Sequence, residues 1–95
     1  MIITKELFKE KINDILIVQF SATWCGPCKS LSKTIEAINA DLANPIYKMD
    51  IDDHQELAST LNIRSVPALI RFENGNEVNR IIGNRSADVL KKFAS

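Results

Sequence analysis

The chain has 95 residues, of which 45% are hydrophobic and 25% charged. This length predicts one domain, residues 1–95, and the composition is typical of a globular protein rather than a disordered one. Lys and Arg number 12, as do Asp and Glu, so the formal net charge is zero. Balanced charge argues against a nucleic-acid binder, which needs excess cations, and against a polybasic membrane anchor.

The N-terminal segment does not resemble an export signal. The apolar part of residues 1–11 is too short for a signal-peptide core, and charged residues follow it. The longest purely apolar run, residues 15–18, is far too short to span a bilayer. We therefore expect a soluble, cytoplasmic protein with no membrane partner, and we expect a monomer.

The predicted elements begin with a short helix over residues 4–13, capped by Thr4. Residues 15–20 form a short apolar run rich in β-branched side chains, which predicts a buried strand. Apolar residues then recur on one stripe over residues 28–43, which predicts a helix that ends at Asn44-Pro45.

The second half begins with a strand predicted over residues 46–51. Asp52 and Asp53 then suit the start of a helix, because carboxylates cap free N–H groups there. Strands over residues 66–72 and 77–82 flank Asn74-Gly75, a strong hairpin signal, since a type I′ turn needs positive φ at both positions. The inward residues predicted for these helices are Leu57, Ala58 and Leu61, and, after a cap at Ser86, Val89, Leu90 and Phe93.

The order of these elements predicts an α/β fold. Strands that alternate with helices favour parallel pairing, and the closing hairpin adds antiparallel strands. We therefore expect a central mixed sheet of about four strands, flanked by helices on both faces.

Cys25 and Cys28 are the only cysteines in the chain. They follow the carboxyl end of the first predicted strand, where open α/β sheets place their sites. Cys25 lies at or just before a helix N-terminus, where unpaired N–H groups and the helix dipole favour the reactive thiolate. Pro27 suits a first helical turn, because its missing N–H costs nothing there.

Two other uses of the cysteine pair are less well supported. A structural disulfide would close a very short loop and remove little entropy from the unfolded chain. A structural zinc site usually needs four ligands, whereas the chain offers two cysteines and His54, which we expect to be a solvated surface residue. The pattern therefore favours redox chemistry and predicts no metal site.

Several segments together resemble the thioredoxin family, over essentially the whole chain. They are WCGPCK at 24–29, KMDID at 48–52, IRSVP at 63–67, ENG at 73–75 and IIG at 81–83. The resemblance implies a thioredoxin fold. Residues 1–3 leave room for only a stub of the family's N-terminal strand, so we expect that strand to be shortened.

The resemblance also implies an enzyme, a protein-disulfide reductase that serves electron transport and cell redox homeostasis. Cys25 would attack a disulfide in a partner protein, and Cys28 would resolve the mixed disulfide, leaving a redox-active Cys25–Cys28 disulfide. No cofactor would be bound, and an NADPH-dependent thioredoxin reductase would recharge the protein. Its other partners would be disulfide-containing proteins.

A substrate-docking surface is implied around the cysteines. The resemblance implies a cis bond at Val66-Pro67, beside the two thiols. Trp24 could be an ordinary core aromatic, but its place in the loop favours partial exposure and docking. The implied surface consists of Trp24, Gly26, Pro27, Val66, Pro67, Ile82 and Gly83.

Gln19 is the most informative departure from the family, which usually has a buried aspartate there. A glutamine cannot ionise and so cannot act as a general base, which predicts slower turnover at Cys28 with proton transfer left to water. It could also be simply a hydrogen-bonded buried amide. Lys48, which usually faces that aspartate, loses this partner and could pair with Asp50. Ser21 occupies a position that is often tryptophan.

A non-catalytic alternative is a thioredoxin-fold binding subunit that holds a partner enzyme through the surface around the cysteines. Gln19 and the shortened N-terminal strand slightly favour it. A disulfide oxidant or isomerase is disfavoured, because such relatives usually carry a His or another polar residue between the cysteines.

Overall fold

The computed structural model describes residues 1–95 and contains a four-stranded sheet with helices on both faces. Its elements are α1 (Lys5–Lys11), β1 (Ile15–Ser21), α2 (Gly26–Ile38), a 3₁₀ turn (Asn39–Asp41), β2 (Ile46–Asp50), α3 (Gln55–Thr60), β3 (Ala68–Glu73), β4 (Asn76–Ile82) and α4 (Ala87–Phe93). The strand order is β2-β1-β3-β4, with β1 parallel to β2 and the other pairs antiparallel. The predicted α/β fold with a mixed sheet is confirmed.

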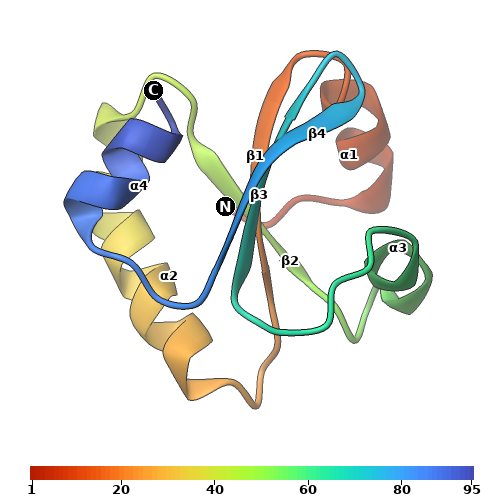
Figure 1. Ribbon diagram of the computed structural model, residues 1–95, viewed down its shortest axis with the longest axis horizontal. Helices are drawn as coiled ribbons and strands as arrows, with labels where there is room; N and C mark the ends of the chain where they lie inside the picture. The colour runs from red at the N-terminus through yellow and green to blue at the C-terminus, as the bar shows by residue number, and fades with distance from the viewer.

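The sheet divides the interior into two apolar layers. Figure 1 shows α2 and α4 on one side of the sheet and α1 and α3 on the other. Alternate side chains of a strand point to opposite faces. Accordingly, Ile17 of β1 packs in the core beneath α2 and α4, whereas Leu16, Val18 and Phe20 pack in the other core. Burial on both faces explains why β1 reads as a continuous apolar run.

The N-terminal strand is reduced to a stub, as expected. Ile2 forms a single parallel bridge with Lys48 at the outer edge of β2. The N–H of Ile3 donates to the Lys48 carbonyl at 3.0 Å, and the Lys48 N–H donates to the Met1 carbonyl at 2.7 Å. The backbone of the N-terminal segment is therefore hydrogen-bonded to β2 only at Lys48, in the middle of the strand.

Asn39 ends α2 earlier than the sequence predicts. We expected a helix over residues 28–43, but α2 begins at Gly26 and ends at Ile38. The Asn39 side chain receives the N–H of Ile46 at 2.7 Å and donates to its carbonyl at 3.0 Å. Because it thus pairs with the edge of β2, the chain tightens into a 3₁₀ turn instead of continuing the helix.

Three smaller predictions were wrong. The helix expected from Asp52 and Asp53 begins only at Gln55, because Asp52 is engaged with Trp24. β3 begins at Ala68 rather than at residue 66, after a cis Val66-Pro67 bond. Val89, expected to face inward, is 42% exposed, whereas Leu90 beside it is fully buried.

The predicted turns and caps are otherwise confirmed. Asn74 and Gly75 both have positive φ, 54° and 86°, as a type I′ hairpin requires. Thr4 and Ser86 cap α1 and α4 through their side-chain oxygens. None of the helices is long and apolar enough to cross a membrane.

The exposure of Val89 and the burial of Leu90 predict unequal costs of truncation. Leu90→Ala should lower the free energy of unfolding by about 2–5 kcal/mol, since it opens a cavity beneath α4. Val89→Ala, the matched control on the same helix, should cost no more than about 1 kcal/mol. Urea unfolding measures both, and equal losses would contradict the observed face of α4.

Candidate active site

The two cysteines lie at the junction between β1 and α2. Cys25 is the N-cap of α2, in an extended conformation, and its Sγ accepts the N–H of Cys28 at 3.1 Å. Pro27 lies in the first turn, where no N–H is needed. Cys25 and Cys28 form a disulfide. The helix N-terminus thus directs a backbone donor at the sulfur of Cys25, where it can stabilise a thiolate in the reduced state.

Apolar side chains cover one side of the two cysteines. Cys25 is 5% exposed and Cys28 is 1% exposed, and both pack with Ala22 against Ile51 and Val66. The Sγ of Cys25 lies 3.7 Å from the Val66 carbonyl oxygen. In the disulfide this sulfur carries no hydrogen, so the approach is a contact rather than a bond. The Val66-Pro67 peptide bond is cis, as the resemblance implied.

Trp24 is largely on the surface, with 69% of its area exposed. Its indole N–H donates to Oδ2 of Asp52 at 3.1 Å, and Oδ1 of Asp50 accepts the N–H of Asp52 at 2.7 Å. The expected exposure of Trp24 is confirmed. Sequence reasoning missed the role of Asp52, because nothing local shows that residues 28 positions apart meet.

The remaining residues of the implied docking surface differ in exposure. Gly26 and Pro27 are exposed, Val66 is half-buried and Pro67 is buried. Ile82 is 41% exposed at the end of β4, opposite Ala68. Gly83 has a φ of 92° and donates its N–H to the Pro67 carbonyl at 2.9 Å, which ties the segment after β4 to the cis-proline. The structure therefore joins Ile82 and Gly83 to Pro67.

Gln19 is a buried amide bonded to α2. It is 1% exposed, its Nε2 donates to the Cys28 carbonyl at 3.2 Å, and its Oε1 accepts the Ser32 hydroxyl at 3.2 Å. Both ends of the amide are thus engaged by one helix. Of the two alternatives, the hydrogen-bonded amide is what the geometry shows, and the effect on turnover stays a prediction.

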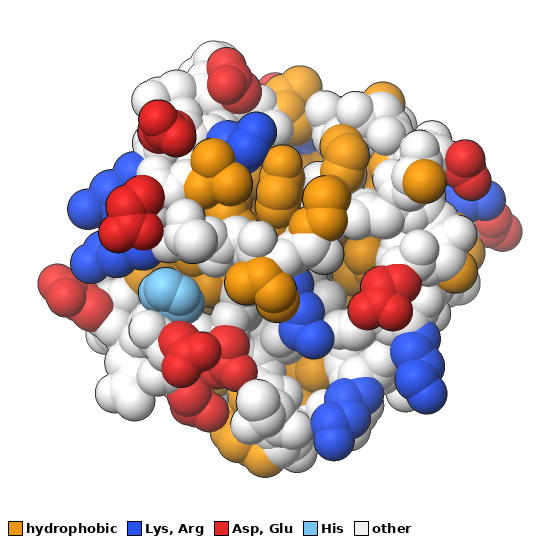
Figure 2. All heavy atoms as spheres, turned by 180° about the vertical axis from the view of Figure 1, so that it is seen from behind, with side chains coloured by type: hydrophobic (Ala, Val, Ile, Leu, Met, Phe, Trp, Pro, Cys, Tyr) orange, Lys and Arg blue, Asp and Glu red, His pale blue; other side chains and the backbone are white.

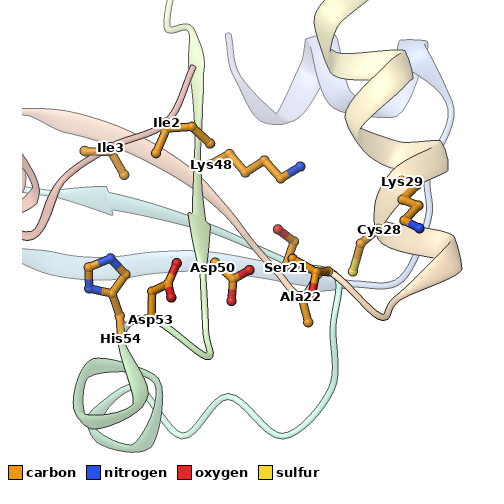
Figure 3. Close-up of a pocket in the computed structure, with 11 residues that line it drawn as sticks. Ile2, Ile3, Ser21, Ala22, Cys28, Lys29, Lys48, Asp50, Asp53 and His54 are labelled. Atoms are coloured by element: carbon orange, nitrogen blue, oxygen red, sulfur yellow. The ribbon is translucent and has the colours of Figure 1, made fainter.

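A polar pocket of about 550 Å³ lies on the other side of Cys28. Figure 3 shows its lining, with the Cys28 sulfur directed from α2 toward Ser21 and Ala22. We call this the Cys28 pocket; its polar residues are Ser21, Thr23, Lys29, Lys48, Asp50, Asp53 and His54. His54 is half-buried there, and Figure 2 shows its imidazole on the surface, as expected.

Lys48 takes part in no ion pair. The ion pairs of the chain are Arg71–Glu73 and Arg80–Glu77, so the pairing of Lys48 with Asp50 does not form. The hydrogen bonds of Glu77 raise the pKa of Arg80 further above its usual range. No three His, Cys, Asp or Glu side chains are grouped so as to hold a metal ion.

Comparison with known proteins matches residues 1–95 to the family model described as Thioredoxin. The chain is similar to the thioredoxin of Chlamydia trachomatis, with 38% identity over 99% of this chain and 94% of that protein. Thioredoxin-2 of Saccharomyces cerevisiae is 35% identical over 85% and 79% of the two chains. Among solved structures, Plasmodium falciparum thioredoxin superposes with a TM-score of 0.86 at 31% identity, covering 98% and 94%.

The two bonds of Gln19 predict a defined loss of stability. Gln19→Leu should cost about 1–3 kcal/mol, because the Cys28 carbonyl and the Ser32 hydroxyl lose their partner while buried. Ser32→Ala removes the hydroxyl that Gln19→Leu leaves unpaired. The double variant should therefore lose less free energy of unfolding than the two single variants together. Urea unfolding of the four proteins gives the coupling, and strict additivity would contradict a shared network.

Proposed function

The chain belongs to the thioredoxin family and is a dithiol–disulfide oxidoreductase that reduces protein disulfides, and we propose that Cys25 is its nucleophile and Cys28 its resolving thiol. The observation that carries this assignment is the bond from the Cys28 N–H to the Cys25 sulfur. It places a backbone donor and the N-terminus of α2 at one sulfur only. The Cys25 thiolate is favoured by these contacts, whereas Cys28 lies deeper.

The proposed reaction proceeds in two exchanges. The Cys25 thiolate attacks one sulfur of the partner's disulfide, and the other partner sulfur leaves as a thiolate. Cys28 then attacks the Cys25 sulfur, which forms the internal disulfide and releases the second partner thiolate. The partner gains two electrons and the Cys25–Cys28 dithiol loses two. Because Cys28 is one helical turn away, this second step is intramolecular and fast relative to escape.

We propose that the apolar rim around Cys25 receives the partner. Its members are Trp24, Gly26, Pro27, Val66, Pro67, Ile82 and Gly83. Pro67 has no N–H, and its carbonyl is taken by Gly83, so an extended partner segment can pair with the backbone of Val66. The bond from Trp24 to Asp52 holds the indole in place at the edge of this surface.

We further propose that the chain works as a single domain, as a monomer in the cytoplasm. An NADPH-dependent thioredoxin reductase would return Cys25–Cys28 to the dithiol, with no cofactor held by this chain. Gln19 contributes no ionisable group beside Cys28, and we expect resolution to depend on proton transfer elsewhere. Lys48 supplies a positive charge to the Cys28 pocket.

Reduction of insulin with a recycling reductant tests the assignment. Cys25→Ser should abolish turnover. Cys28→Ser should instead form a mixed disulfide with the partner that persists, because nothing resolves it, and mass spectrometry should detect that adduct. The two variants are matched controls for each other. If the Cys25→Ser variant retained turnover and formed an adduct on Cys28, then Cys28 would be the nucleophile and the proposed assignment would be wrong.

The docking surface predicts a difference between two exposed residues of β4. Ile82→Ser should raise KM for insulin several-fold with little change in kcat, because it removes apolar contact with the bound partner. Val78→Ser is the matched control, since Val78 is 51% exposed on the same strand but lines a surface hollow beside α4. Steady-state kinetics measure both, and equal values of KM would exclude Ile82 from the surface.

A further inference from the structure

The resolving step leaves one proton without an assigned acceptor. Cys28 must lose its proton to attack the Cys25 sulfur, and Cys28 is 1% exposed. Gln19 donates to the Cys28 carbonyl, but it has no ionisable group and its amide is already engaged at both ends. The proton must therefore leave Cys28 by another route.

The Cys28 pocket lies beside the Cys28 sulfur (Figure 3). Its volume of about 550 Å³ has room for several water molecules, each of which takes about 30 Å³ in the liquid. Cys28 and Asp50 both line it. Figure 3 shows Ser21 between them, with the Asp50 carboxylate on the β2 side and the Cys28 sulfur on the α2 side.

Ser21 gives independent evidence that this pocket takes a polar occupant. It is 2% exposed, and its hydroxyl donates to or accepts from no group of the protein. No fully enclosed side-chain oxygen or nitrogen lacks a hydrogen bond, so this hydroxyl opens onto the pocket. A buried hydroxyl without a protein partner is normally satisfied by water.

Strand register places Asp50 next to Ser21. The two residues are partners across the parallel β1–β2 pair. Ile46 lies in the core beneath α2, so the alternation of β2 directs Lys48 and Asp50 to the same face as Cys28. The α2 face of the sheet is therefore apolar at one end and polar at the other, where the resolving cysteine lies.

We propose that the Asp50 carboxylate accepts the proton of the Cys28 thiol, through water at Ser21, as Cys28 resolves the mixed disulfide. The Cys28 S–H bond breaks and its proton passes to Asp50. The Cys28–Cys25 S–S bond forms, and the bond between Cys25 and the partner breaks, with the electron pair leaving on the partner's sulfur. Asp50 then returns the proton to solvent. This inference rests on the proposed roles of Cys25 and Cys28.

Other charged groups also face this pocket. Lys48 extends from β2 and Lys29 from α2, and each favours a thiolate at Cys28. Asp53 and His54 lie in the turn before α3, and Figure 3 shows them beyond Asp50 as seen from Cys28. Asp53 and His54 are therefore the rival proton acceptors, and they provide the matched controls.

The test separates the two exchanges with the chromogenic disulfide dithionitrobenzoate. The reduced protein should release one thionitrobenzoate as Cys25 attacks and a second as Cys28 resolves. Asp50→Asn should leave the first phase unchanged and slow the second at pH 7 by at least about tenfold, a modest loss for proton transfer because water intervenes. The difference should narrow as the pH rises, because hydroxide can then take the Cys28 proton in place of the carboxylate.

In Asp50→Asn the asparagine keeps the Oδ1 acceptor that Asp50 offers to the N–H of Asp52, so the fold should survive. An unchanged first phase verifies that it does. Ser21→Val retains the Asp50 carboxylate but removes the hydroxyl at which the bridging water binds. It should therefore slow the second phase as well. Asp53→Asn and His54→Gln should resolve at the rate of the parent protein. An unchanged second phase in both Asp50→Asn and Ser21→Val would overturn the proposal, as would an equal loss in Asp53→Asn. Loss of the first phase in the parent protein would instead overturn the proposed role of Cys25.

Discussion

The hydrogen bonds between Gln19 and the first two turns of α2 are the constraint on which the site depends. They join the middle of a buried strand to the Cys28 carbonyl and to Ser32, so the helix N-terminus has one position relative to the sheet. Cys25, as the N-cap of that helix, is placed with it. An amide fulfils this role without a buried charge, which would cost several kcal/mol unless paired.

The placement gives the two sulfurs different environments. Cys25 meets the apolar rim near Val66, whereas Cys28 meets a polar pocket beneath α2. The proposed docking surface and the Cys28 pocket are therefore lined by different residues.

The end of β2 connects these two sides. Asp50 accepts the N–H of Asp52, and Asp52 accepts the indole N–H of Trp24. Figure 2, which shows the molecule from behind, has acidic side chains gathered beside the only imidazole of the chain and cationic side chains spread around them. Acidic side chains therefore gather on this part of the surface although the chain has zero net charge.

Local signals predicted the elements well where one interaction decides the structure. Positive φ at Asn74 and Gly75, the caps at Thr4 and Ser86, and the buried strand β1 all follow from a few neighbouring residues. The helix boundaries were predicted less well. Asn39 turns away from α2 to bond Ile46, and Asp52 bonds Trp24 instead of capping a helix. Both competing partners are distant in sequence, so no local pattern contains them.

The sequence by itself determined the chemistry of this protein, because two cysteines spaced as WCGPC between a strand and a helix allow few other uses. It also identified Gln19 as the unusual residue near them. Only the tertiary structure decided what surrounds each sulfur. Ser21, Lys48 and Asp50 come from two strands, and Cys28 from a helix above them. Their meeting depends on strand register and helix placement, which are set by packing across the whole sheet rather than by any neighbouring residue.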